Sequence, residues 1–247
     1  MKIHFLGTNN WYDTKTGQTP CTLIDTKEAY IILDAGYGIH KVDKYIKPGK
    51  PIYLFISHLH VDHICGLHVL PKFKFTEPLT IFCADESKKY LTKFTQHPFM
   101  SPIKNLPYKT KIVGIRPGKF VKPLSFVCKN LKHIDYDLGY RFNLERKIIT
   151  YCADTAVCEN DYLLAKDADL LMHECAFSPG SVHDAWGHSN PEDGAKLAKR
   201  AQVKKLMLTL FGASGYPSVM HRQEAQRVAR KIFAPTEIAY DDLIVEL

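Results

Sequence analysis

The sequence predicts an α+β fold in which two packed sheets carry helices on their outer faces. Strand-like stretches come first in succession, and the later ones alternate with helical stretches, an order typical of two packed sheets. With 247 residues, of which 45% are apolar, the chain can bury one large core. We find no internal repeat, low-complexity segment or linker, so we expect a single domain over residues 1–247.

Apolar runs rich in β-branched and aromatic residues mark the strands, and a helical period marks the helices. The first strands are expected at residues 2–6, 21–25, 29–33, 52–56, 79–83, 111–115, 123–129 and 147–152. Helices are expected at residues 85–95, 192–202 and 222–233. The last two of these helices alternate with strands at residues 204–210 and 236–246.

Composition constrains the class of protein. The formal net charge of +7 is compatible with a phosphate-bearing substrate, although Lys-rich surfaces often serve only solubility. Seven scattered cysteines, an odd number, favour reduced thiols in a cytoplasmic protein over a disulfide framework. Residues 1–5 enter a strand at once and no apolar run approaches a membrane span, so we expect neither a signal peptide nor a membrane anchor.

The stretch His58-Leu59-His60-Val61-Asp62-His63 is the strongest functional signal in the chain. It follows the apolar stretch 52–56, which indicates a buried strand ending near residue 57. His58 and His60 are two residues apart and can therefore point to the same side of an extended chain, as ligands of one metal must. The stretch therefore predicts a metal site.

Asp62 and His63 fall where the apolar spacing suggests a short helix, so they project in another direction and can serve a second metal. Imidazole nitrogens and carboxylate oxygens suit Zn²⁺, with Mn²⁺ or iron as alternatives. A structural zinc site is the competing interpretation. Such sites are usually closed by cysteines, whereas histidine with carboxylate favours an open, catalytic centre.

These four polar residues resemble the HxHxDH signature of the metallo-β-lactamase fold superfamily of hydrolases. The resemblance extends to the stretch 5–8, similar to the opening strand and its glycine turn, and to the stretch 31–36, similar to a strand that ends in a structural Asp. The resemblance implies a four-layer αββα sandwich. It also assigns His133 as the third ligand of the first metal and Asp154 as the carboxylate that bridges two metals. Taken alone, His133 would more often be a strand-end polar residue and Asp154 a helix cap.

The stretches 171–175 and 187–189 resemble the paired loops of the ribonuclease Z branch, in which a Glu orients a His beside the scissile phosphate. The matching residues are Glu174 and His188. A carboxylate on one imidazole nitrogen keeps the ring protonated, and a protonated His can stabilise phosphorane charge and protonate the leaving oxygen. His188 also precedes a capping pattern, Asn190 and Pro191, so it is in addition a helix N-terminal neighbour.

The remaining histidines are expected to be surface or satisfied core residues. They are His4, His40, His68, His97, His173, His183 and His221, of which His183 and His221 are the least certain. We expect Asp34 to support the ligand loops rather than to contact metal. Cys65 and Cys175 are expected to be packing residues rather than thiolate ligands.

The chain departs from the branch pattern in two places. Leu210 occupies the position where the branch usually has a seventh ligand, a histidine that serves the second metal. Only 20 residues separate His133 from Asp154, which leaves no room for the long tRNA-clamping arm of many ribonucleases Z. This short interval resembles the cyclic phosphodiesterases of the phosphonate pathway.

We therefore predict a metal-dependent hydrolase, foremost a phosphodiesterase acting on a small cyclic or linear phosphodiester or nucleotide. The alternatives are a tRNA 3′-processing endoribonuclease, a thioester or lactone hydrolase, and a non-catalytic nucleotide- or RNA-binding module. The expected metal ligands are His58, His60, Asp62, His63, His133 and Asp154, for one or two Zn²⁺ ions, and the expected catalytic residues are His188, Glu174 and Asp62. We also expect a homodimer and no membrane partner. RNA is a possible substrate.

Overall fold

In the computed structural model, which describes residues 1–181 and 186–247, the chain forms two compact units. The first unit comprises residues 1–8, 18–115 and 241–247, and the second comprises residues 9–17 and 116–240. Each unit is therefore assembled from more than one segment of chain. The single domain predicted from the sequence stays a prediction.

The first unit contains a seven-stranded sheet in the order β15-β1-β3-β4-β5-β6-β7. Strands β4 to β7 are parallel, and they are joined to the antiparallel strands β3, β1 and β15 through β4. β4 and β6 are buried at every position, which explains their nearly continuous apolar sequences. The strands are β1 (Lys2–Gly7), β3 (Cys21–Asp25), β4 (Tyr30–Leu33), β5 (Ile52–Phe55), β6 (Leu79–Ala84), β7 (Thr110–Ile115) and β15 (Leu243–Glu246).

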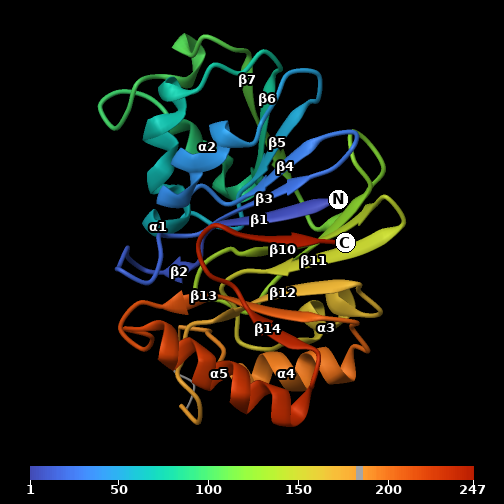
Figure 1. Ribbon diagram of the computed structural model, residues 1–247. Coiled ribbons are helices and arrows are strands. Elements are labelled where there is room, and N and C mark those ends of the chain that lie inside the picture. Colours follow the sequence, from blue (N-terminus) through green and yellow to red (C-terminus); the bar gives the residue numbers. More distant parts are fainter. Residues whose placement is uncertain (182–185) are drawn as a thin grey trace. The chain divides into compact units, whose positions relative to one another are not determined.

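In the sequence of the first unit, helical segments come after the strands β4, β5 and β6. They are η1 (Tyr37–Lys44), α1 (Val61–Ile64), η2 (Cys65–Lys72), α2 (Asp85–Phe94) and η3 (Ile103–Asn105). η1 and η2 pack on each other and bury Ile39, Val42, Leu67 and Leu70 in one apolar core with β3 to β6. α2 packs on β6 and β7 (Figure 1). The short helix expected after residue 60 is thus α1, and it carries Asp62 and His63.

The second unit contains an eight-stranded sheet with the main order β14-β13-β12-β11-β10-β9-β8, in which β2 also pairs with β13. β8 to β11 are antiparallel, whereas β11 to β14 run parallel. Because parallel strands end at the same edge of a sheet, the segments after β11, β12 and β13 are brought together. The strands are β2 (Asn9–Asn10), β8 (Gly118–Phe120), β9 (Phe126–Asn130), β10 (Leu138–Leu144), β11 (Lys147–Cys152), β12 (Leu170–Cys175), β13 (Leu206–Gly212) and β14 (Thr236–Ile238).

In the part of the second unit that the structure describes, the sheet is covered by α3 (Glu159–Ala165), α4 (Pro191–Arg200) and α5 (Val219–Ile232). α4 and α5 lie side by side against β12, β13 and β14 (Figure 1). α4 begins at Pro191, and the side chain of Asn190 accepts a hydrogen bond from the backbone N–H of Asp193 at 3.0 Å. The capping pattern read from the sequence at this point is therefore confirmed.

Two expectations about elements were wrong. The stretch 171–175 is not a loop, because it lies in β12, a fully buried central strand. The expected strand at residues 236–246 is two strands, β14 and β15, which belong to different sheets. The residues between them include Asp242, whose φ of 67° is incompatible with a continuous strand. Within residues 1–181 and 186–247, no helix is both long enough and apolar enough to cross a membrane.

Candidate metal centre

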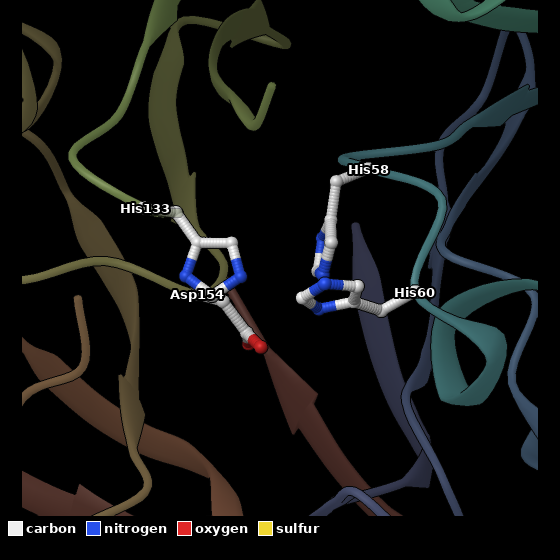
Figure 2. A group of neighbouring side chains, drawn as sticks. All are labelled: His58, His60, His133 and Asp154. Carbon is white, nitrogen blue, oxygen red and sulfur yellow. The ribbon is translucent and has the colours of Figure 1, made fainter. Parts of the chain in front are cut away.

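In the first unit, the predicted motif follows the carboxyl end of β5. His58 and His60 leave the strand in an extended segment, and their ring centroids are 4.5 Å apart (Figure 2). His63 lies one helical turn further on, with its ring centroid 4.1 Å from that of His58. Asp62 places Oδ2 3.7 Å from Nε2 of His63. The four polar residues therefore gather at one end of one strand.

Asp34 and Ser57 orient this group through hydrogen bonds. Oδ1 of Asp34 accepts the backbone N–H of Ser57 at 2.7 Å. Oδ2 of Asp34 accepts the Ser57 hydroxyl at 2.9 Å and lies 2.9 Å from Nδ1 of His63. Asp34 is fully buried and has a φ of 58°, an uncommon backbone conformation that the surrounding contacts must stabilise. The carboxylate thus supports the loop, as its sequence context suggested.

These contacts decide which nitrogen of each ring carries a proton. The Ser57 hydroxyl has a single hydrogen and donates it to Asp34, so it can only accept from Nδ1 of His58, which lies 3.1 Å away. Nδ1 of His63 likewise donates to Asp34, which as a carboxylate only accepts. In both rings Nε2 is then the nitrogen with a lone pair. Histidine ligands of metals are usually oriented in this way.

In the second unit, His133 lies between β9 and β10. Lys132 forms an isolated bridge with Ala156, and this bridge brings the segment of His133 alongside the segment that follows β11. Nδ1 of His133 lies 3.3 Å from the backbone carbonyl of Gly187, which again assigns the proton to Nδ1. Gly187 has a φ of 83°, and a Cβ there would lie 2.5 Å from the carbonyl oxygen of Lys132. Glycine is therefore required for this contact.

Asp154 follows the end of β11 and is 2% exposed. Candidate ligand atoms of His133 and Asp154 lie within 4.8 Å of each other, and Figure 2 draws both side chains. Oδ1 of Asp154 accepts a hydrogen bond from the Asn10 amide at 2.8 Å. Asn10 belongs to β2 and was not among the residues expected from the sequence. Its partner is 144 residues away, so no local pattern indicates the contact.

Glu174 and His188 form the predicted pair. Oε1 of Glu174 accepts from Nδ1 of His188 at 2.9 Å and from the backbone N–H of Thr155 at 2.6 Å. Oε2 accepts from the backbone N–H of Ala176 at 2.9 Å. Burial raises the pKa of Glu174 to about 7, against the opposing effect of His188. Ligand atoms of Asp154, Glu174 and His188 also lie within 4.8 Å of one another, so this pair adjoins Asp154.

The other histidines differ from these ligands in position, burial and hydrogen-bond partners. His173 lies inside β12, is fully buried, and its Nδ1 lies 2.9 Å from the carbonyl oxygen of Glu174. Burial lowers the pKa of His173, which favours a neutral ring. His221 is exposed at the start of α5 and its Nδ1 lies 2.8 Å from the Ser218 hydroxyl. His183 lies outside the described residues. Cys175 is buried and its sulfur lies 3.1 Å from the Tyr216 hydroxyl.

Leu210 lies near the end of β13, 1% exposed. β12 and β13 pair Glu174 with Thr209 and Cys175 with Phe211, so Leu210 is the extra residue of a bulge. Its φ of 51° is unusual for a branched side chain. A hydrocarbon side chain therefore occupies this position at the edge where β11 and β12 also end.

Comparison with known proteins places this chain among metal-dependent hydrolases. The model of the "Beta-lactamase superfamily domain" family matches residues 30–209. A ribonuclease Z of Enterococcus faecalis is 28% identical, and the match covers 100% of this chain and 97% of the relative. That alignment has 312 positions for a chain of 247 residues, so at least 65 positions of the alignment have no counterpart here.

Solved structures give the same result for the fold. The metallo-β-lactamase fold protein YhfI of Bacillus subtilis has a TM-score of 0.83 at 20% identity, covering 100% of this chain and 98% of YhfI. The short form of human tRNase Z has a TM-score of 0.77 at 19% identity, covering 100% and 99% of the two chains. At this level of identity the likeness shows the fold alone, and it confirms the predicted metallo-β-lactamase fold.

Proposed function

Since the chain belongs to the β-lactamase superfamily of metal-dependent hydrolases, we propose that it hydrolyses phosphodiester bonds. The observation that carries this proposal is the buried pair of Glu174 and His188 beside Asp154. A histidine held by a buried carboxylate suits proton transfer to an oxygen leaving group. Thioester or lactone hydrolysis and a purely binding role give no comparable reason for this pair.

The donor set fits a divalent cation. In our proposal His58, His60, His133 and Asp154 are metal ligands, and their candidate ligand atoms lie within 4.8 Å of one another. The Nδ1 contacts of His58 and His133 assign the proton of each ring to Nδ1 and the lone pair to Nε2, the usual arrangement of histidine ligands, which supports the assignment. Three imidazoles with one carboxylate suit Zn²⁺, with Mn²⁺ or iron as alternatives, and Asp62 and His63 form a partial second site.

A bound cation would supply Lewis acidity and lower the pKa of a coordinated water molecule. The chain's own residues orient His188 and transfer the proton. Glu174 receives Nδ1–H of His188 and so directs Nε2 of that ring away from the carboxylate. The proton on Nε2 can then pass to the leaving oxygen of the substrate. The backbone N–H groups of Thr155 and Ala176 fix the Glu174 carboxylate and with it the orientation of His188.

The relatives favour RNA as the substrate. The ribonuclease Z of Enterococcus faecalis is 28% identical and aligns along nearly all of both chains. Cleavage at an RNA 3′ end therefore takes precedence over the small phosphodiester that the sequence alone suggested. The small cyclic or linear phosphodiester stays as a second candidate, because this chain lacks at least 65 positions of the 312-position alignment.

The experiment is a substrate panel on protein loaded in turn with zinc, manganese, cobalt and iron, with bound metal quantified in each sample. The panel contains bis(p-nitrophenyl) phosphate, cyclic nucleotides and a precursor tRNA with a 3′ trailer. We expect metal-dependent hydrolysis of bis(p-nitrophenyl) phosphate. Site-specific trailer removal supports the RNA candidate, whereas faster cleavage of cyclic nucleotides supports the second one.

Failure on every phosphodiester with metal bound would contradict the proposal and favour a binding module. The His188→Ala variant is the matched control, since it should retain metal and lose activity toward all substrates of the panel. Size-exclusion chromatography with light scattering on the same samples tests the expected homodimer.

A further inference from the structure

The hydroxyl of Ser189 completes a closed hydrogen-bond network around His188, within the second unit. It donates to the backbone carbonyl of Thr155 at 2.6 Å. The backbone N–H of Thr155 donates to Oε1 of Glu174 at 2.6 Å, and the same oxygen accepts from Nδ1 of His188 at 2.9 Å. His188 and Ser189 are neighbours in the chain, so these three bonds close on themselves.

Three members of this network are buried, and the fourth reaches the surface. Ser189, Thr155 and Glu174 are 0% exposed, whereas the side chain of His188 is 17% exposed. Breaking one bond of a buried network is costly, because a polar group then loses its partner away from water. The buried members therefore favour one arrangement, and the imidazole is the member that a substrate can contact.

Thr155 is a fixed anchor for the network. Its Oγ1 accepts the backbone N–H of Lys132 at 3.1 Å and donates to the carbonyl of Ala156 at 2.7 Å. The N–H of Ala156 in turn donates to the carbonyl of Lys132 at 2.9 Å. Because Thr155 is held by these contacts, the hydroxyl of Ser189 determines where residues 188–189 lie relative to the segment that follows β11.

The contact with Glu174 does not by itself fix the direction of Nε2. One hydrogen bond at Nδ1 determines which nitrogen carries the proton, but the imidazole of His188 can still rotate about that bond. The bond from Ser189 to Thr155 restrains the backbone from which the imidazole extends. Phe177 restrains it further, because its N–H donates to the Ser189 carbonyl at 3.0 Å and its ring lies edge-on to the imidazole, with centroids 5.6 Å apart.

We propose that Ser189 is a positioning residue for proton transfer by His188. Its hydroxyl holds the backbone of residues 188–189 so that Nε2 of His188 points at the leaving oxygen of the substrate. As the phosphorus–oxygen bond breaks, the electron pair stays on the leaving oxygen and the Nε2 proton passes to it. A displaced Nε2 donates this proton poorly, since proton transfer requires hydrogen-bond distance. This inference rests on the phosphodiester hydrolysis proposed above.

The test compares kcat for two aryl phosphodiesters, bis(p-nitrophenyl) phosphate and diphenyl phosphate, on metal-loaded protein. Phenolate is a stronger base than p-nitrophenolate, so its departure depends more on protonation. In Ser189→Ala, kcat for diphenyl phosphate should fall by roughly 10- to 100-fold, the cost of misplacing a reacting group. For bis(p-nitrophenyl) phosphate, kcat should fall by a smaller factor. A role of Ser189 in folding alone would lower both kcat values equally.

Two further variants attribute the effect to this hydroxyl. Ser178→Ala is the matched control, because the Ser178 hydroxyl also donates to a backbone carbonyl, that of Gly215 at 3.2 Å, but lies outside the network. It should leave both kcat values unchanged. Ser189→Thr retains the hydroxyl and should keep the wild-type ratio of the two values. Metal content and thermal unfolding verify that each variant is loaded and folded.

A double variant tests whether Ser189 acts through His188. In the His188→Ala protein, Ser189→Ala should lower kcat for bis(p-nitrophenyl) phosphate no further, because the imidazole that Ser189 positions is already absent. An additional loss equal to that of the single Ser189→Ala variant would show an independent role for Ser189 and overturn the inference.

Equal losses for the two substrates in Ser189→Ala would also overturn it, as would wild-type kcat values for both. If the metal-loaded wild type hydrolyses neither substrate, the proposed phosphodiester hydrolysis itself fails, a result distinct from the failure of this inference.

Discussion

The candidate ligands of the first unit lie within six consecutive residues, whereas those of the second unit follow separate strands of one sheet. In the first unit a single buried carboxylate, Asp34, orients the group through Ser57 and His63. In the second unit the orienting contacts are backbone carbonyls, backbone N–H groups and the Asn10 amide. The first group thus depends on one local support, and the second depends on the topology of a sheet.

The largest effect is expected from the first unit. His60→Ala removes one of few proposed ligands, so bound metal and phosphodiesterase activity should be lost together. Metal content of the purified variant and hydrolysis of bis(p-nitrophenyl) phosphate measure both. His68→Ala, at an exposed histidine of η2, is the control and should keep both. Full metal content in His60→Ala would remove this residue from the ligand set.

In the second unit, His188→Ala should separate binding from chemistry. We expect turnover to fall by roughly 10²- to 10⁴-fold, the range for a positioned acid-base group, while metal content stays unchanged. Glu174→Gln should lower turnover in the same direction, because an amide cannot hold the imidazolium as a carboxylate does. If His188→Ala loses its metal, His188 is itself a ligand and the proposed division between binding and chemistry fails.

A smaller effect, on metal affinity, is expected from Asp34 in the first unit. Asp34→Asn keeps one oxygen for the backbone N–H of Ser57 but replaces the oxygen that accepts from the Ser57 hydroxyl and from His63 by an NH₂ group. We therefore expect metal affinity to fall by about 10- to 100-fold. Competition with a chromogenic chelator measures this affinity. Asp43→Asn, at an exposed aspartate paired with Lys72, is the control. Equal affinities in the two variants would show that Asp34 does not act on the ligands.

The fold and the first group of ligands were predictable because their signals are local. Apolar runs located β5 and β11, and the six-residue motif gave the histidines that follow β5. β12 was misread as a loop because it contains His173 and Glu174, polar residues whose partners come from distant segments. β10 was not predicted as a strand, because it too contains a polar residue with distant partners. Arg141 in β10 donates to the carbonyls of Leu164 and Lys166, each at 2.6 Å.

The smallest expected effect concerns the pH dependence of the second unit's stability. Burial raises the pKa of Asp161, in the first turn of α3, from 3.8 to about 7. The folded protein therefore holds this proton up to higher pH than the unfolded chain does. Its contribution to stability is fully present below about pH 3.8 and decreases as pH rises toward 7.

Asp161→Asn should flatten this decrease, whereas Asp43→Asn in the first unit should not change it. Denaturant unfolding between pH 5 and 8, with hydrogen exchange of the β9–β11 amides, compares the two variants. The same slope for Asp161→Asn and the wild type would show that Asp161 is not protonated in the folded protein near pH 6.

The central claim is that His58, His60, His133 and Asp154 are metal ligands. X-ray absorption at the zinc K-edge of the loaded protein tests it directly, because imidazole ligands give a characteristic scattering pattern. We predict that nitrogen and oxygen atoms surround the zinc. In His133→Ala, the zinc that the variant retains should show a smaller imidazole contribution than the zinc of the wild type. An environment containing sulfur, or an imidazole contribution unchanged in a folded His133→Ala variant, would contradict the claim.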